Sequence, residues 1–502
     1  MKNLKYLVLL TFIAFIAQSS GYAGSATWNR NPPSSDWNDP LNWTPATVPN
    51  GASDIASFGF TNRTKVAISA GVEVASIVFE PGASAYTIRT TMHLGMGLTG
   101  TGIVNDSGIT QNLLVTNSSV LSFSGNASAG SNMRIIVPGQ INITNDGGNG
   151  TIYFNDASSA GDGTYTCKGG RTDNGSGAAV YLFDDATAGT STFKLEGGVI
   201  PGARGAHMTF GGASLGTATI VVQGGVAGSQ ETAVEVSGDA KGAGARLKLF
   251  GNGNLYLGAH DLPGFTLGSV EGDGRIFLGF AGSQKGRTLT VGNNLNTTFA
   301  GVIDDMGAKG SLTKAGKGSL TLTGANTYLG TTLVTKGTLL ISNTTGSGTG
   351  TGAVAVTLGT LGGNGTIAGG VTIGSGIGQE AAVAPGASGT SVGTLTILSP
   401  LSCQADATYD FDVDTDNALA DQLTANGLTI DSGATFSPTS FGTDTLTLGI
   451  TFTAINNISA TPISGTFANL PDGGTIQIGS NTFQANYEGG DGNDLTLTVV
   501  ND

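Results

Sequence analysis

The chain has 502 residues, of which 83 are glycine and only 11% are charged, and its formal net charge is −14. The low charged fraction excludes a charge-rich disordered chain, and glycine without a G-x-y period excludes collagen. An acidic chain without a cluster of basic residues argues against nucleic acid as a partner. Short runs of Val, Ile, Leu and Thr between glycine-rich turns predict an all-β protein.

Residues 1–23 have the pattern of a secretory signal peptide. Lys2 and Lys5 precede an apolar run, and small residues stand near Ala23 where a signal peptidase would cut. This pattern predicts Sec-type export with a mature start near Gly24. The apolar run has about 12 residues, shorter than the ~20 that a membrane helix needs, so we expect no membrane span in the mature chain.

Residues 24–60 differ from the rest of the chain because they contain all three tryptophans, Trp28, Trp37 and Trp43. A stack of strand coils exposes its first coil unless something covers it, so this segment is predicted to be an N-terminal aromatic cap. The alternative is that the three rings bind glycans by stacking on sugar. Capping is the favoured interpretation because every repeat protein needs it.

From residue 61 onward, strand patterns recur about every 8 to 12 residues and are separated by Gly, Asn, Asp or Pro-Gly turns. Coils of this length cannot bury their own apolar face, whereas stacked coils can, which predicts a parallel β-helix. The best helix candidate is the short segment 417–423. Cys167 and Cys403 lie too far apart along such a stack to form a disulfide, and we expect two free, buried thiols. The residues predicted to stack inward are Leu320/Leu322, Leu339/Ile341, Val354/Val356, Val371/Ile373, Leu395/Ile397, Leu428/Ile430, Leu446/Leu448 and Leu495/Leu497.

One stretch is specific enough to suggest a family. Residues 310–342 read GSLTKAGKGSLTLTGANTYLGTTLVTKGTLLIS, and similar text follows at 359–376, 384–397 and 463–498. This text resembles the autotransporter-associated β-strand repeat, also called the passenger-associated transport repeat. The resemblance implies a right-handed parallel β-helix exported to the surface of a Gram-negative bacterium, with no shared catalytic residues.

The resemblance and the strand patterns together predict the domain organisation. We expect irregular solenoid coils over 61–300, autotransporter-associated repeats over 301–400, and a β-strand region that closes the solenoid over 401–502. A complete autotransporter would end in a translocator barrel of at least ~8 strands. The repeat text instead continues to the end of this sequence, so the chain is expected to lack that barrel.

Acidic residues give the candidate metal sites. Asp410, Asp412, Asp414 and Asp416 alternate through DFDVDTD, which would place four carboxylates on one face of a strand. Their spacing departs from a calcium loop, so a solvated acidic face is favoured over calcium. The turn GGDGND, which holds Asp491 and Asp494, resembles a single unit of a calcium-binding repeat, but such repeats bind calcium through several stacked copies. We therefore expect no cofactor, with calcium as the open alternative.

The sequence predicts a secreted or cell-surface structural protein, adhesin-like and not an enzyme. Its Thr- and Asn-rich wall would make weak multivalent contacts with extracellular glycans or surface proteins, or associate with copies of itself into filaments or layers. The first alternative is a carbohydrate-active enzyme, a polysaccharide lyase or hydrolase, on the same scaffold, for which Asp184-Asp185 and Asp304-Asp305 are candidate acid pairs. The second alternative is a glycan-binding module that uses the N-terminal tryptophans.

Overall fold

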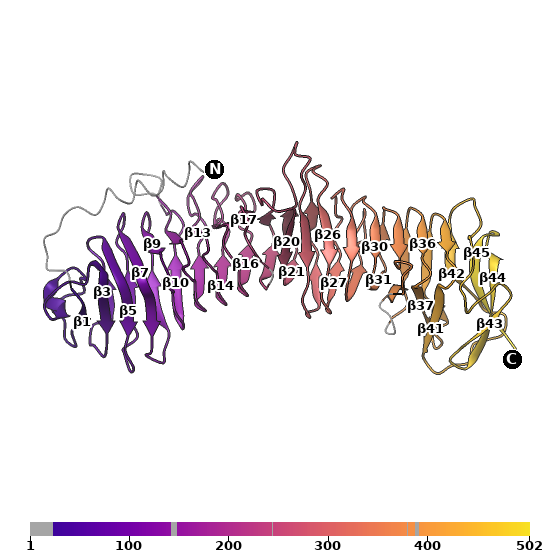
Figure 1. Ribbon diagram of the computed structural model, residues 1–502, viewed down its shortest axis with the longest axis horizontal. Coiled ribbons are helices and arrows are strands. Elements are labelled where there is room, and N and C mark those ends of the chain that lie inside the picture. The colour runs from indigo at the N-terminus through magenta and orange to yellow at the C-terminus, as the bar shows by residue number, and fades with distance from the viewer. Residues whose placement is uncertain (1–23, 142–147, 243, 379, 387–390, 502) are drawn as a thin grey trace. The chain divides into compact units, whose positions relative to one another are not determined.

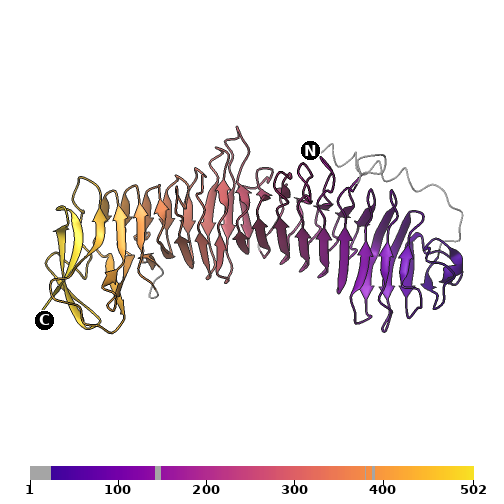
Figure 2. The ribbon, with the colours of Figure 1, turned by 180° about the vertical axis from the view of Figure 1, so that it is seen from behind.

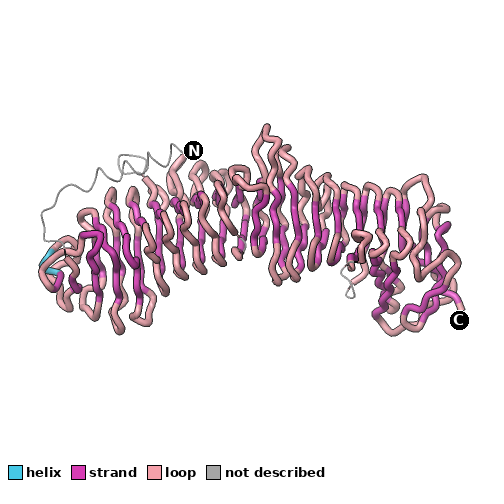
Figure 3. Tube along the Cα trace, in the orientation of Figure 1, coloured by secondary structure: helices cyan, strands magenta, loops and turns pink. Residues whose placement is uncertain are grey.

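The computed structural model describes residues 24–141, 148–242, 244–378, 380–386 and 391–501, and the predicted signal peptide lies outside them. It divides into two compact units, unit 1 (Met1–Leu255) and unit 2 (Tyr256–Asp502). Among the described residues the one helical segment is the 3-10 turn η1 (Pro40–Asn42), and the rest are strands and loops (Figure 3). The all-β prediction is confirmed. The best helix candidate, 417–423, is not a helix, because that stretch is a turn that leads into strands β38 (Leu419–Ala420) and β39 (Gln422–Ala425).

Unit 1 is a stack of coils in which each coil adds a strand to two parallel sheets (Figure 1). The first, called the odd sheet, begins with an antiparallel pair, β1 and β2, and continues in parallel. Its strands are β1 (Ala26–Trp28), β2 (Trp43–Thr44), β3 (Gly51–Phe58), β5 (Val72–Phe79), β7 (Gly95–Asn105), β9 (Val120–Phe123), β11 (Thr151–Phe154), β13 (Ala179–Phe183), β15 (His207–Gly211) and β17 (Thr232–Ser237), followed by β19 (Gly253–Tyr256). The second, the even sheet, contains β4 (Lys65–Ala67), β6 (Thr87–Arg89), β8 (Gln111–Leu114), β10 (Met133–Val137), β12 (Thr164–Cys167), β14 (Thr192–Leu195), β16 (Thr219–Gln223) and β18 (Arg246–Phe250). Isolated parallel bridges form a third side, from Gly102 through Ser128, Ser159, Thr187 and Ser214 to Lys241.

The core of unit 1 is made of side chains that alternate inward and align from coil to coil. Phe123 and Phe154 stack with their ring centroids 4.9 Å apart, and Tyr165 and Phe193 stack at 4.3 Å. One aligned column of buried side chains runs through Leu121, Ile152, Val180, Met208 and Val234. Burial of this kind is the main favourable term that holds successive coils together.

Glycines with left-handed backbones occupy one corner of four successive coils in unit 1. Gly130, Gly161, Gly189 and Gly216 have φ angles between 55° and 75°. A Cβ atom on Gly161 would overlap the carbonyl oxygen of Gly130, and the same relationship recurs at the next two glycines. Only glycine fits both the backbone conformation and the spacing between coils.

Unit 2 is built from three sets of stacked strands, most of them parallel (Figure 1). The wall sheet contains β21 (Ser269–Gly272), β24 (Thr297–Phe299), β27 (Ser319–Leu322), β29 (Thr338–Ile341), β31 (Gly359–Gly363), β34 (Ala381–Pro385), β37 (Ala407–Asp414) and β41 (Thr435–Phe441), with β38 at its side. The narrow sheet contains β20 (Gly264–Leu267), β23 (Thr288–Val291), β26 (Ser311–Lys314), β28 (Thr332–Val334), β30 (Val354–Val356), β33 (Val371–Ile373), β36 (Leu401–Cys403) and β40 (Leu428–Ile430). The third side begins with β22 (Arg275–Phe277) and β25 (Val302–Asp304), and later coils contribute β32 (Thr366–Ile367), β35 (Thr394–Ile397) and β39 to the closing sheet.

The closing sheet ends unit 2 with antiparallel strands, as the view from behind shows (Figure 2). Strand β42 (Thr451–Asn457) pairs with β45 (Asp494–Val500), which pairs with β44 (Asn481–Gly489), which in turn pairs with β43 (Thr475–Ile478). An aromatic cluster of Tyr409, Phe411, Phe436 and Phe467 lies beneath, with ring centroids 5.3 to 6.1 Å apart. This end of the unit therefore has an aromatic core, and the antiparallel strands close it.

The predicted inward pairs are buried with one exception. Leu446 is buried, but Leu448 is 56% exposed, because this stretch is a loop and turn instead of a strand. Cys167 and Cys403 are free and buried as predicted. Burial raises the pKa of each thiol to about 12, so both stay protonated and act as small apolar core residues.

Candidate functional site

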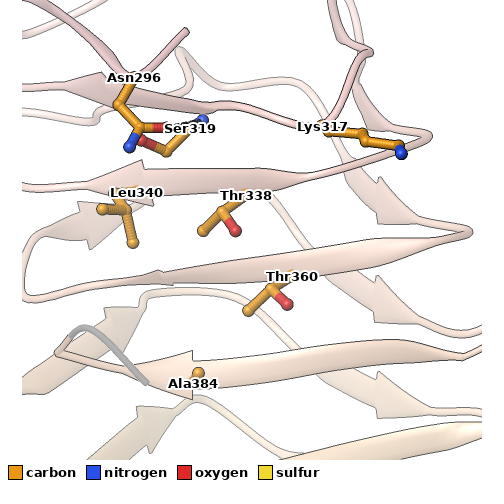
Figure 4. A pocket seen from close by; sticks show the side chains of 7 residues that line it. All are labelled: Asn296, Lys317, Ser319, Thr338, Leu340, Thr360 and Ala384. Carbon is orange, nitrogen blue, oxygen red and sulfur yellow. Dashed lines mark hydrogen bonds between the residues drawn. The ribbon is translucent and has the colours of Figure 1, made fainter. Parts of the chain in front are cut away.

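A shallow depression of about 290 Å³ lies on the outer side of the wall sheet in unit 2 (Figure 4). Strands β27, β29, β31 and β34 run across it, so four successive coils contribute to one surface. Its lining residues are Asn296, Lys317, Ser319, Thr338, Leu340, Thr360 and Ala384. The lining combines hydroxyl groups, one ammonium group and small apolar side chains.

The register of the strands explains the shape of this depression. Ser319, Thr338 and Thr360 align in one outward column of hydroxyl groups. In the next outward column Leu340 aligns with Gly362, which aligns with Ala384. Gly362 and Ala384 are both buried, so Leu340 is the apolar side chain that this column exposes to the depression. Such a surface can hold a polar ligand by hydrogen bonds on one side and apolar contact on the other.

Hydroxyl groups also line the outside of the narrow sheet. One outward column runs in register through Thr266, Thr290, Thr313, Leu333, Ala355, Thr372, Ser402 and Thr429. Because the column is dominated by threonine and serine, the same hydrogen-bonding group recurs at the spacing of the coils. The predicted threonine-lined outer face is present on this side of unit 2.

The three tryptophans lie inside the N-terminal cap. Trp37 is fully buried, and its ring centroid is 5.0 Å from that of Trp43 and 5.6 Å from that of Phe58. Trp28 and Trp43 are directly opposite each other on β1 and β2, with centroids 5.1 Å apart. Each indole N–H donates to a backbone carbonyl. None of these buried rings has an exposed face for a sugar, so the geometry favours capping over glycan binding.

The carboxyl groups of the acidic strand, Asp410, Asp412, Asp414 and Asp416, do not gather at one point. Asp414 accepts hydrogen bonds from the backbone and side chain of Asn417, and Asp416, which lies beyond the end of β37, accepts from the backbone N–H of Thr443 at 2.6 Å. Asp412 is 1% exposed, so the expected solvated acidic face is wrong at this position. The reason is the hairpin of β37 and β38, which folds back over this strand.

Asp421, which was not predicted as a site residue, completes this acidic group. Its carboxyl group accepts hydrogen bonds from the backbone N–H groups of Gly393 at 2.8 Å and Asp412 at 3.1 Å. Burial, together with the nearby charges of Asp412 and Asp410, raises the pKa of Asp421 to about 7 against the lowering effect of the two hydrogen bonds. Burial also raises the pKa of Asp410. The sequence gives no signal for Asp421, because its partners lie on β37 and in the preceding coil, at Gly393.

The segment GGDGND forms the tight turn between β44 and β45. Gly489 pairs with Asp494 across the turn, and Gly490 and Gly492 have positive φ angles. The Asp494 carboxylate accepts a hydrogen bond from the backbone N–H of Asn457 at 2.8 Å, while Asp491 is exposed. In the described part of the chain, no group of three or more His, Cys, Asp or Glu side chains is arranged to hold a metal ion.

The carboxylates of the candidate acid pair Asp304-Asp305 bind other groups of the protein. Asp305 is buried and accepts hydrogen bonds from the backbone N–H groups of Gly307, Gly310 and Leu329 at 2.8 to 2.9 Å. Asp304 lies 3.5 Å from the guanidinium group of Arg275. In the other pair, Asp184 has a φ angle of 59° and lies in a turn.

Lys314 is a buried cation that the alternating pattern had not identified. It occupies an inward position of β26, in register with Val291 and Val334 on the neighbouring coils. Its ammonium group donates to the carbonyl oxygens of Ala315, Gly316 and Lys336 at 2.7, 2.9 and 3.1 Å. Burial lowers the pKa of Lys314 to about 8. The side chain thus links the turns of two coils.

Comparison with known proteins agrees with part of the sequence resemblance. Residues 312–341 match the family model of the Passenger-associated-transport-repeat, which is a repeat and not an enzyme family. Among solved structures, the chain is similar to the crystal structure of the Haemophilus influenzae Hap adhesin at 11% sequence identity and a TM-score of 0.30, over 89% of this chain and 64% of that chain. The chain thus spans less than two thirds of that adhesin chain. No curated protein matches the chain.

The matched repeat covers strands of two successive coils of unit 2, since 312–341 runs from within β26 through β27 and β28 to the end of β29. No helix within the described residues is long and apolar enough to cross a membrane. The strand register of both units is that of a parallel solenoid. This chain is therefore a parallel β-solenoid protein that carries an autotransporter-associated, or passenger-associated transport, repeat.

Proposed function

We propose that this protein is a secreted or cell-surface structural solenoid, adhesin-like and non-catalytic, that makes weak multivalent contacts with extracellular glycans or surface proteins. The observation that carries the proposal is the in-register column of Ser319, Thr338 and Thr360 beside the depression in the wall sheet. A column that repeats one hydrogen-bonding group at every coil suits ligands that repeat as well.

The chemistry of the depression favours a saccharide over a charged macromolecule. Hydroxyl groups of threonine and serine can donate to and accept from sugar hydroxyls, and Leu340 offers apolar contact to the C–H groups of a sugar ring. Lys317 adds one ammonium group, which would favour a sugar with a carboxylate or sulfate. The surface is shallow, so each contact would be weak and affinity would come from repetition.

The proposed location rests on the predicted signal peptide and on the repeat at 312–341, whose family description refers to passenger transport. The Hap protein is described as an adhesin, and this supports an adhesive role only by analogy.

The test is retention of the mature chain, residues 24–502, on immobilised neutral and acidic polysaccharides. A variant with Lys317→Ala and Thr338→Ala removes an ammonium and a hydroxyl group from the depression, and we expect roughly tenfold weaker retention. The matched control is Thr372→Ala, which removes a hydroxyl group from the outer column of the narrow sheet. Equal retention by the depression variant and the wild type would contradict the proposed site.

The alternative of a polysaccharide lyase or hydrolase on the same scaffold makes a different prediction. Incubation with pectins, alginates and other acidic polysaccharides would then release oligosaccharides. Substituting Asp304 or Asp305 by Asn would abolish that release if this acid pair were catalytic.

A further inference from the structure

Four successive coils of unit 2 each expose an apolar side chain at the same corner. The corner is formed by loops 257–263, 278–287, 305–310 and 329–331, which lead into strands β20, β23, β26 and β28 of the narrow sheet. Leu262, Phe280, Met306 and Leu329, hereafter the apolar ridge, are between 42% and 48% exposed. Figure 1 shows loops near β26 that extend farther from the sheets than the turns of the following coils.

Hydrogen bonds between neighbouring loops stack them on one another. The Arg287 guanidinium donates to the carbonyl oxygen of His260 at 2.6 Å, which joins the first two loops. The Gly286 N–H donates to the Ala308 carbonyl oxygen at 2.6 Å, which joins the second and third. The Leu329 N–H donates to the Asp305 carboxylate at 2.9 Å, which joins the third and fourth. The apolar ridge therefore stands on an ordered set of loops.

The loop that holds Met306 is fixed in a conformation that directs this side chain outward. Asp305 is buried and binds three backbone N–H groups of its own loop and the next. The Met306 N–H donates to the Asp304 carboxylate at 2.7 Å, and Met306 has a φ angle of 53°. A left-handed backbone is uncommon for a large side chain and is found where the surroundings hold it in place.

Cations lie beside the apolar ridge in a chain that is otherwise acidic. Residues 278–310 contain three cations, Lys285, Arg287 and Lys309, against two acids, whereas the whole chain has a net charge of −14. Lys285 and Lys309 are exposed on the same loops as Phe280 and Met306. The two acids of this stretch, Asp304 and Asp305, are engaged with Arg275 and with backbone N–H groups. The nearest acid along the first loop is Asp261, which is exposed.

We propose that the apolar ridge docks the protein onto a lipid surface with anionic headgroups. Single apolar side chains that stand out from a convex corner can enter the boundary between headgroups and acyl chains, whereas a protein partner would need a matching groove. The flanking lysines would bind the anionic headgroups, each adding to the attraction near the surface. This inference goes beyond the proposed contact function, because it uses a different side of unit 2 and a different ligand.

The test is flotation of the mature chain, residues 24–502, with phosphatidylcholine vesicles that either contain or lack phosphatidylglycerol. We expect the wild type to float with the anionic vesicles and to bind neutral vesicles more weakly. A variant with Leu262→Ser and Phe280→Ser should bind the anionic vesicles about tenfold more weakly, because two inserting side chains are lost. A variant with Lys285→Glu and Lys309→Glu should lose most binding at low salt.

The matched control is Ile458→Ser, which removes a similarly exposed apolar side chain outside the apolar ridge. We expect it to float like the wild type. The proposal is overturned if the wild type stays unbound to anionic vesicles, or if the control loses as much binding as the ridge variants. It is also overturned if the ridge variants float with anionic vesicles like the wild type and differ from it only in binding to a protein partner. The variant of Lys317 and Thr338 should float normally, which separates this proposal from the proposed function.

Discussion

The backbone N–H of Asp412 donates a 3.1 Å hydrogen bond to the carboxyl group of Asp421, and both residues are 1% exposed. This contact brings two acids together where the sequence shows only an alternating acidic strand. It has a consequence for stability, because a buried carboxyl group beside other carboxylates holds its proton to higher pH.

Stability should therefore fall as the pH rises toward neutrality. Burial raises the pKa of Asp421 to about 7, whereas in the unfolded chain an Asp titrates near pH ~4. The folded state then binds one more proton than the unfolded state between these values. The stabilisation is complete below about pH 4 and is lost as the pH rises through 7. Thermal melting of the wild type across this range should show the decline.

The variant Asp421→Asn stays uncharged at every pH and should flatten this part of the profile. The exposed acid Asp491, substituted in the same way, is the matched control and should leave the slope unchanged. A slope that is identical in the wild type and in Asp421→Asn would show that another group controls it.

Replacing a corner glycine should separate the cost of backbone conformation from the cost of overlap between coils. Gly161→Ala carries both costs, because the φ angle at this position is 65° and the new Cβ would overlap the Gly130 carbonyl oxygen. Gly108→Ala carries only the cost of backbone conformation, because the φ angle is 78° and nothing lies within 4 Å of the new Cβ. We expect a loss of about 1 kcal/mol for Gly108→Ala and at least twice that for Gly161→Ala, measured by denaturant unfolding. Equal losses would contradict the tight stacking of this corner.

Removing a ring from the N-terminal cap should destabilise the protein strongly. Trp37→Ala would leave a cavity beside Trp43 and Phe58 and should cost about 3–5 kcal/mol of unfolding free energy. Leu41→Ala is the control, because Leu41 is exposed in the same segment and should change stability by less than ~0.5 kcal/mol. If both variants melted alike, the tryptophans would not act as a cap.

The inward ammonium group of Lys314 should stabilise unit 2 through the three carbonyl groups it binds. Lys314→Met keeps an unbranched apolar side chain between Val291 and Val334 but removes the donor, and should cost about 1–3 kcal/mol. Lys317→Ala removes an exposed lysine three residues away and should be neutral. A stabilised Lys314→Met would instead show that burying the ammonium group costs more than its hydrogen bonds return.

Calcium should have little effect on the folded protein. The carboxylates of Asp414, Asp416 and Asp494 accept hydrogen bonds from protein groups instead of converging on one point. We expect the same melting temperature in millimolar calcium and in excess chelator. A rise of several degrees with calcium would revive the calcium alternative, and Asp412→Asn would then test the acidic strand.

The repeating part of the fold could be predicted from sequence, whereas the ends and the connections could not. Pairs such as Leu320/Leu322 and Leu339/Ile341 alternate locally and recur, so their inward position follows from a strand period of two. The pair Leu446/Leu448 shows the same alternation and fails, because alternation alone does not reveal whether a neighbouring strand is present to pair with it.

The candidate site depended on contacts that are distant along the chain. The burial of Asp412 is set by the hairpin that follows it, and the aromatic cluster joins Tyr409 to Phe467 across several intervening strands. The depression in the wall sheet depends on Ser319, Thr338 and Thr360 aligning in one outward column, which requires the register of the coils. None of these relationships has a local sequence pattern.

The most direct test of the central claim, that the outer walls bind by contact without chemistry, is one experiment with two measurements on the same sample. The mature chain is passed over immobilised acidic and neutral polysaccharides while the eluate is analysed for oligosaccharides. We predict weak retention that strengthens when the protein is displayed in many copies on a bead, with no release of oligosaccharides. Release of oligosaccharides, or the absence of retention even in the multivalent form, would contradict the account.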